Sequence, residues 1–314
     1  MKRGVKISIL GAGRVGSTVA HTIAVQGLAS EIVLVDIMKD KAKGEALDIS
    51  QGTVLLDTCT NVISGDYPDT FDSDIIIFTL GAARKPGQSR IDLAKGNVAI
   101  VESVIPEVVR YSPDAKYVIV SNPVDIITYT IMRLSGVAEN QIIGTGCLLD
   151  TARLREEVST YAHISPKNIH LQVFGEHGAT AMIPWSLGSI YSTRFDEYVA
   201  EHPEIRMPDH KSLLDSVHSA GGQVIKLKGA TFNAVAIITA YVCSCILHDA
   251  KAVMPLSTMM HGEFGLENVC VSLPCVLGAR GIERVNVPKL TEEEVKEFVA
   301  SAKSLQDVTA GLDI

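Results

Sequence analysis

The chain lacks the features that mark secreted, membrane-spanning or metal-binding proteins. Its six cysteines contain no CxxC pair and no disulfide-like spacing, so we expect free thiols in a reducing cytoplasm and no metal site. The longest apolar run, residues 234–247, is too short and too mixed to span a bilayer. The amino terminus reaches a strand and a glycine too soon for a signal peptide. These absences predict a cytoplasmic protein without a membrane segment.

Positive charge is scarce as well. The 314 residues include 28 Lys and Arg against 36 Asp and Glu, a formal net charge of −8. Such a field repels phosphate backbones and anionic lipids, which argues against nucleic acid or a membrane as partner. Local arginines can still bind a small anion. With 46% hydrophobic residues, no internal repeat and no low-complexity linker, we expect two tightly packed domains.

The chain does carry a strand, a glycine motif and a helix in immediate succession. Residues 5–10 are short, β-branched and apolar, and residues 14–28 show helical spacing of apolar side chains. Between them, Gly11 permits a tight turn, Gly13 lets the backbone approach a pyrophosphate, and Gly16 lets the helix pack on the strand. Arg14 and Val15 lie at the helix start, where amides face phosphate groups. This context predicts a dinucleotide site.

A second strand, residues 31–36, ends on Asp36, twenty residues beyond Gly16. A carboxylate at this distance accepts hydrogen bonds from the ribose hydroxyls of NAD and repels the additional phosphate of NADP. The motif and Asp36 together therefore predict NAD as cofactor.

Strands and helices go on alternating through the first half, which is typical of an α/β, doubly wound parallel sheet of the Rossmann type. We assign residues 1–145 to this NAD-binding domain and residues 146–314 to an α+β catalytic and substrate domain. The first half has further strands at 61–64, 74–79, 116–121 and 141–144 and helices at 39–56 and 91–111. In the second half we expect helices at 148–162, 212–227, 232–247 and 291–305 and strands at 170–174, 182–190, 253–259 and 269–277.

Charged and polar side chains follow the strands at the edge where such sheets bind ligands. Arg84 and Arg90 belong to a Gly/Pro-flanked loop, which is either a solvated basic turn or a mobile loop that delivers an arginine to an anion. Asp150 and Arg153 stand three residues apart on one helix face. They form either a surface ion pair or a functional pair, in which Arg153 binds a substrate carboxylate and Asp150 orients a histidine. His177, between glycines, is then an ordinary polar residue or a proton donor and acceptor near neutral pH.

The motifs GAGRVGS, LVD, RKPGQSR, SNPVD, LDTARLR and GEHG occur in the order and spacing of the L-lactate/L-malate dehydrogenase family. The resemblance extends over residues 5–305. It implies an NAD-dependent oxidoreductase that transfers hydride between NADH and a 2-oxo acid. His177 is then the acid/base, Asp150 its partner, Arg153 the carboxylate clamp and Arg90 the arginine that polarises the carbonyl. The implied cofactor contacts further along the chain are Thr79, Gly81, Asn97, Ser121 and Asn122, the last of which also binds substrate.

The substrate signals in this resemblance disagree. Arg84 stands where the family has glutamine for lactate and arginine for malate, and Ala179 replaces a common aspartate that would repel a dicarboxylate. Thr231, in the sequence KGAT, matches a threonine of lactate dehydrogenases. Because a second substrate carboxylate needs a charged partner in a closed site, we rank malate/oxaloacetate first and lactate/pyruvate as the alternative. A non-catalytic NAD-binding protein on this fold is a remote third possibility.

The resemblance also bears on assembly. In bacterial lactate dehydrogenases, positions that match Arg155 and His170 line a subunit interface and bind the phosphates of fructose bisphosphate. The alternative is that Arg155 is simply an exposed helix residue and His170 simply a side chain at a strand edge. We expect a homo-oligomer, with a tetramer favoured and a dimer as the alternative.

Overall fold

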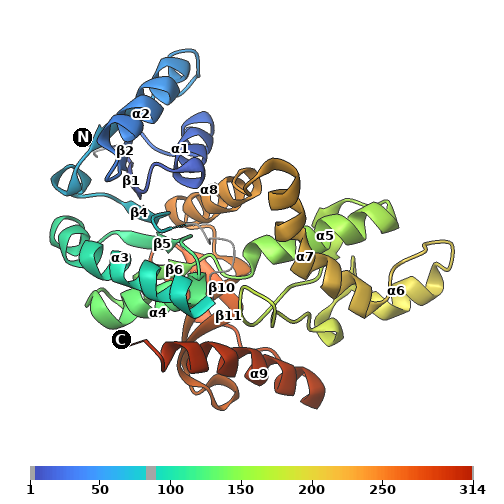
Figure 1. The fold of residues 1–314 in the computed structure, drawn as a ribbon. Helices are drawn as coiled ribbons and strands as arrows, with labels where there is room; N and C mark the ends of the chain where they lie inside the picture. The colour runs from blue at the N-terminus through green and yellow to red at the C-terminus, as the bar shows by residue number, and fades with distance from the viewer. Residues whose placement is uncertain (1–3, 83–89, 313–314) are drawn as a thin grey trace.

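The computed structural model describes residues 4–82 and 90–312, except for the side chain of Arg90. One nine-stranded sheet runs through the molecule in the order β12-β11-β10-β6-β5-β4-β1-β2-β3 (Figure 1). Its strands are β1 (Lys6–Leu10), β2 (Glu31–Val35), β3 (Asn61–Gly65), β4 (Ile75–Phe78), β5 (Lys116–Ile119), β6 (Ile142–Gly144), β10 (Ala252–His261), β11 (Glu267–Gly278) and β12 (Gly281–Val285). A small antiparallel sheet joins β7 (Ile169–His170), β8 (Ser189–Ile190) and β9 (Thr193–Arg194).

Helices cover both faces of the large sheet and extend from its second half (Figure 1). They are α1 (Arg14–Val25), α2 (Lys39–Thr53), α3 (Arg90–Tyr111), α4 (Val124–Leu134), α5 (Leu148–Ala162), α6 (Phe195–Glu201), α7 (His210–Lys228), α8 (Asn233–Leu247) and α9 (Glu292–Thr309). None of them, over the part of the chain that the structure describes, is long and apolar enough to cross a membrane.

The first six strands, β1 to β6, pair in parallel. Every residue of β4 and all but the first residue of β1, β2 and β5 are buried, as expected for strands that have helices on both sides. The prediction of a doubly wound Rossmann sheet followed by an α+β half is therefore confirmed. The short strand expected at 141–144 corresponds to β6.

The second half departs from the expectation in how its strands pair. β10, β11 and β12 continue the Rossmann sheet in antiparallel orientation, and β10 joins β6 where Ser257 lies opposite Gly144. β12 had no counterpart among the predicted elements. The strands expected at 170–174 and 182–190 shrink to two-residue pieces and a single bridge between Phe174 and Met182. Apolar side chains alternate with polar ones in this segment because the apolar ones pack into the protein core. The alternation does not reflect a long β-ladder.

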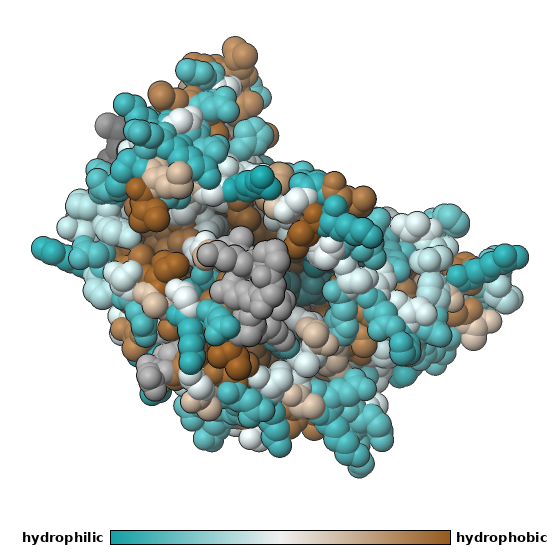
Figure 2. Space-filling view, viewed as in Figure 1, coloured by the Kyte–Doolittle hydropathy of each residue, from teal (hydrophilic) through white to brown (hydrophobic). Residues whose placement is uncertain are grey.

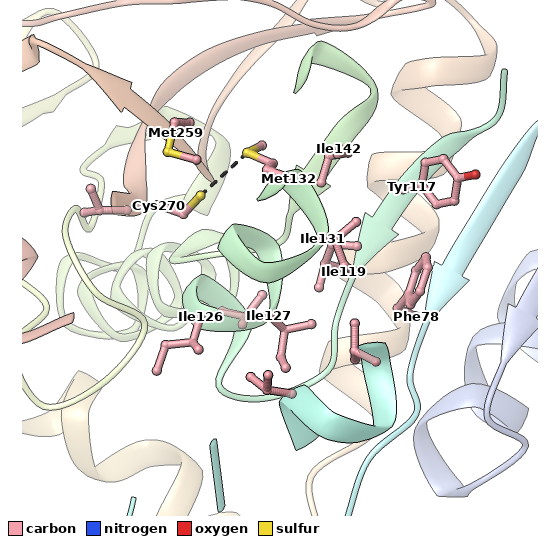
Figure 3. Packing of buried hydrophobic residues seen from close by; sticks show 14 of the residues in the cluster. Phe78, Tyr117, Ile119, Ile126, Ile127, Ile131, Met132, Ile142, Met259 and Cys270 are labelled. Atoms are coloured by element: carbon pink, nitrogen blue, oxygen red, sulfur yellow. Dashed lines mark hydrogen bonds between the residues drawn. The ribbon is translucent and has the colours of Figure 1, made fainter. Parts of the chain in front are cut away.

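One of the apolar cores packs α4, which the sequence analysis had not predicted, against strands from both halves of the chain (Figure 3). Ile127 and Ile131 of α4 are buried in a cluster with Phe78 and Tyr117 of β4 and β5. On the other side of α4, the thiol of Cys270 lies 3.6 Å from the sulfur of Met132. This packing fixes the start of α4, and with it the loop that follows β5.

Candidate active site

The glycine motif forms the tight turn that the sequence predicts. Gly11 has φ of +101°, and a Cβ there would lie 2.9 Å from the backbone of Thr79. A Cβ on Gly16 would lie 1.8 Å from the carbonyl oxygen of Gly11, so helix and turn touch directly. At Gly13, which caps α1, no atom lies within 4 Å of that position. The turn is thus closed toward the protein and open on the side where a ligand would approach.

A cleft of about 770 Å³ begins at this turn and is lined by Gly11, Gly13, Asp36, Thr79 and Gly81 among others. On the molecular face shown in Figure 2, hydrophobic side chains gather beside the centre, and hydrophilic ones cover much of the rim. Leu80 lines the cleft and also packs against the core. The size and mostly apolar walls suit a cofactor.

Asp36 follows β2 directly and has a fixed carboxylate. Its Oδ2 accepts a hydrogen bond from the N–H of Ala12 at 2.6 Å, and its Oδ1 accepts one from the N–H of Met38 at 2.8 Å. The carboxylate is therefore held at the mouth of the cleft next to the glycine turn. This is the place where an adenosine ribose lies when a pyrophosphate sits on α1.

The loops that follow β4 and β5 are joined through Asn97 of α3. Its side-chain amide donates to the carbonyl of Asn122 at 2.7 Å, and its oxygen accepts from the N–H of Ala82 at 2.8 Å. Gly81, at φ of +132°, leaves room for this amide. The hydroxyl of Ser121 donates to the carbonyl of Leu80 at 2.5 Å. Asn97 and Ser121 thus hold the two loops in place by hydrogen bonds to backbone groups.

His177, Asp150 and Arg153 come together although 27 residues separate the histidine from the acid. Asp150 lies in the first turn of α5 and is buried. Its Oδ2 is 2.6 Å from Nδ1 of His177, and its Oδ1 accepts a hydrogen bond from Nη1 of Arg153 at 3.1 Å. One carboxylate therefore orients both the imidazole and the guanidinium.

The electrostatics of the pair favour a charged histidine. Burial lowers the pKa of His177, but the Asp150 carboxylate raises it more, so that the pKa lies above its ordinary value. Burial in turn raises the pKa of Asp150, yet the charges of His177 and Arg153 outweigh that effect and hold the pKa below its ordinary value. The pair is arranged for an imidazole that gains and loses a proton near neutral pH.

Two further side chains hold the histidine loop by its backbone, and the sequence analysis assigned neither of them. Asp125 of α4 is buried, and its Oδ2 accepts a hydrogen bond from the N–H of His177 at 2.8 Å. Ser301 of α9 accepts one from the N–H of Glu176, also at 2.8 Å. Burial raises the pKa of the Asp125 carboxyl to about 6, although the hydrogen bond from the N–H of His177 opposes the shift. The only signal in the sequence is that Asp125 ends the motif SNPVD.

The remaining predicted residues lie on other elements than His177, Asp150 and Arg153, or outside the described residues. Arg14 begins α1 and is exposed, Val15 packs partly on the core, and Thr231 is half-buried between α7 and α8. Arg90 begins α3, with its side chain outside the described residues, and Arg84 lies wholly outside them. Within the described ranges, no group of three or more His, Cys, Asp or Glu side chains could hold a metal ion.

Of the two residues predicted to bind an effector, Arg155 of α5 bonds to the residue that directly follows His170. Nε of Arg155 donates to the carbonyl oxygen of Leu171 at 2.8 Å, next to His170 of β7, which is exposed. Burial lowers the pKa of Arg155. The bond uses Nε and leaves the terminal nitrogens of this guanidinium for other acceptors.

Comparison with known proteins agrees with this geometry. Residues 5–144 match the model of the lactate/malate dehydrogenase NAD-binding domain, and residues 147–311 match that of the lactate/malate dehydrogenase alpha/beta C-terminal domain. An L-lactate dehydrogenase of Thermoanaerobacterium saccharolyticum is 41% identical over 310 residues, which are 98% of this chain and 99% of the relative. One from Clostridium botulinum is 40% identical over 303 residues, 96% of this chain and 95% of the relative. The crystal structure of a minor L-lactate dehydrogenase from Enterococcus mundtii superposes with a TM-score of 0.94, at 33% identity and 99% coverage of both chains.

Proposed function

Since the chain belongs to the lactate/malate dehydrogenase family of NAD-dependent oxidoreductases, we propose that it interconverts L-lactate and pyruvate. The observation that carries this proposal is the hydrogen-bonded group of His177, Asp150 and Arg153 in a chain whose relatives are named L-lactate dehydrogenases. The sequence analysis ranked malate first on the strength of Arg84 and Ala179. The names of the relatives favour the alternative given there, and we adopt it.

The chain uses NAD, and the cleft beside the glycine turn fits it. The open side of Gly13 leaves room for a pyrophosphate, and the fixed carboxylate of Asp36 can bind a ribose. The cleft volume of about 770 Å³ can hold a dinucleotide. When bound, the cofactor supplies or accepts the hydride. We assign its contacts to Gly11, Gly13, Arg14, Val15, Gly16, Asp36, Thr79, Gly81, Asn97, Ser121 and Asn122.

The protein residues bind the substrate and move one proton. In our proposal Arg153 holds the substrate carboxylate through its planar guanidinium. Since Nδ1 of His177 faces Asp150, Nε2 is the ring nitrogen that gives a proton to the carbonyl oxygen and takes it back in the reverse direction. Arg90 stabilises the charge that develops on that oxygen. Asn122 and Thr231 complete the substrate pocket.

The substrate assignment is tested with purified protein and NADH. We expect kcat/KM for pyruvate to exceed that for oxaloacetate. Arg84→Gln should leave pyruvate within a few fold and lower oxaloacetate at least about tenfold, because a buried carboxylate without a charged partner is costly. Arg110→Gln, at the distant end of α3, is the matched control.

Malate remains the second candidate, because Arg84 is present in the chain and Ala179, beside His177, is exposed and uncharged. A wild-type protein that prefers oxaloacetate at least tenfold, and loses that preference in Arg84→Gln, would replace pyruvate by oxaloacetate in the proposal. If neither acid is reduced, the proposed activity itself is wrong.

We further propose a homotetramer that binds a sugar bisphosphate between facing Arg155 and His170 pairs, with a dimer as the alternative. Large apolar side chains exposed on α2 and α8, among them Leu47 and Ile237, support self-association. Millimolar fructose bisphosphate should shift sedimentation toward the tetramer and lower KM for pyruvate, because a ligand that bridges subunits favours their assembly. The double variant Arg155→Gln/His170→Asn should abolish both responses. If wild-type protein shows neither response, the two residues are structural.

We also propose that residues 1–145 and 146–314 form two domains and that the protein is cytoplasmic. The six cysteines are free and five of them are buried, which suits a reducing compartment.

A further inference from the structure

Three methionines line one cavity beside the last turn of α4. The cavity measures about 420 Å³, and its walls include Met132 of α4 and Met259, Met260 and His261 of β10. The whole chain has eight methionines, so three of them at one place call for a local reason. The ladder between β10 and β11 is irregular between Met259 and His261. Such a bulge re-aims a side chain, which explains how two consecutive methionines reach the same cavity.

A thiol adjoins the methionines. Sγ of Cys270 on β11 lies 3.6 Å from Sδ of Met132 (Figure 3). Met259 stands directly opposite Cys270 in the ladder of β10 and β11, and residues paired in this way project from the same side of a sheet. The side chains of Met132, Met259 and Cys270 therefore come together from three different elements. All three are buried.

Two explanations fit such a cluster of sulfur atoms. In the first, the methionines fill gaps in the core and the thiol donates a weak hydrogen bond to a thioether. A filled gap leaves no cavity, however, and here one of about 420 Å³ adjoins the methionines. In the second, the sulfur atoms are ligands of one cation. Two sulfur ligands at about 2.3 Å from one ion lie roughly 4 Å apart, which the observed 3.6 Å nearly matches.

Thioether and thiolate sulfurs are soft ligands, which select Cu(I) over harder cations. We propose that Met132, Met259 and Cys270 form a binding site for Cu(I). The cation enters through the cavity, past Met260 and His261. When it binds, the S–H bond of Cys270 breaks, a Cu–S bond forms and the proton leaves through the cavity to solvent.

The surroundings of the thiol suit this exchange. Burial raises the pKa of the Cys270 thiol, so the thiol keeps its proton until a cation replaces it. A free thiolate would be costly among apolar side chains. The unit formed by Cu(I) and a thiolate has no net charge, so the core accommodates it more easily than either ion alone.

The test is an anaerobic titration with Cu(I) in competition with bicinchoninate, a chelator whose Cu(I) complex is coloured. Because Cys59 is an exposed thiol, all proteins carry Cys59→Ser. This background protein should take one equivalent of Cu(I) from the chelator. Met132→Leu, Met259→Leu and Cys270→Ala should each lower the affinity at least about tenfold, since even residues behind metal ligands change affinity by about 10- to 100-fold. The two leucine variants are expected to fold, because leucine conserves the volume of methionine.

Met254 and Cys275 provide the matched control on the same two strands. They also stand directly opposite each other, but they belong to a different apolar cluster. Met254→Leu and Cys275→Ala should leave the affinity for Cu(I) unchanged. X-ray absorption of the bound cation should show sulfur neighbours at about 2.3 Å.

Four results would overturn the site. They are a background protein that takes no Cu(I) from the chelator, leucine variants that bind as tightly as the background protein, control variants that weaken binding equally, and nitrogen or oxygen neighbours in place of sulfur. None of these measurements uses NADH or a 2-oxo acid, so their outcome is independent of the proposed dehydrogenase activity.

Discussion

His177→Asn should reduce kcat for pyruvate reduction by about 10²- to 10⁴-fold, the usual contribution of a positioned acid. Asparagine keeps a similar size and polarity but has no titratable nitrogen to deliver a proton. The cleft that binds NAD is built from β1, β2 and β4 and their loops, so the dissociation constant for NADH should stay within a few fold. Stopped-flow turnover and fluorescence titration of NADH measure the two quantities.

His163→Asn is the matched control for this variant. His163 ends α5 in a left-handed conformation, with φ of 54°, which asparagine tolerates. This variant should keep full activity. Near-wild-type kcat in His177→Asn would remove the histidine from the proposed mechanism.

Asp150→Asn should lower kcat/KM for pyruvate at neutral pH by at least about 100-fold and change its pH dependence. Reduction requires protonated His177, so activity is present below the pKa of His177 and is lost as the pH rises through it. In the wild type that pKa lies above its ordinary value of 6.5, because the Asp150 carboxylate outweighs the effect of burial. Without the carboxylate, burial remains and lowers the pKa. The descending limb of the profile should therefore move to lower pH.

The profile for L-lactate oxidation should show the opposite dependence, since that direction needs neutral His177. Its rising limb should move to lower pH in Asp150→Asn. Asp215→Asn removes a carboxylate from an exposed pair with Lys211 on α7 and should change neither profile. An unshifted limb in Asp150→Asn would show that another group controls the titration.

Local motifs in the sequence were sufficient to predict the glycine turn and the position of Asp36 beside it. Gly11, Gly16 and Asp36 act through the turn and strand in which they stand, so their spacing along the chain already determines their geometry. The helix of residues 148–162 was predicted with its observed bounds for a similar reason. Its apolar period and the proline that follows its end are both local.

Contacts between distant segments could not be predicted in this way. The hydrogen bond from His177 to Asp125 spans 52 residues and uses a backbone N–H, which leaves no trace in residue types. The same holds for Ser301, whose hydroxyl reaches the histidine loop across 125 residues. The short strand β12 was missed because its five residues mix apolar and charged side chains. Its pairing with β11, and not its own pattern, makes it a strand.

The shared sheet constrains how the molecule unfolds. β10 pairs with β6, and each of the two larger apolar clusters contains residues from both halves of the chain, such as Leu10 with Leu273 and Ile7 with Leu256. A fragment ending at residue 145 would expose the edge of β6 and leave both clusters incomplete. We therefore expect the two halves to unfold together, so that heat or denaturant melts the cofactor cleft and the histidine loop in a single transition.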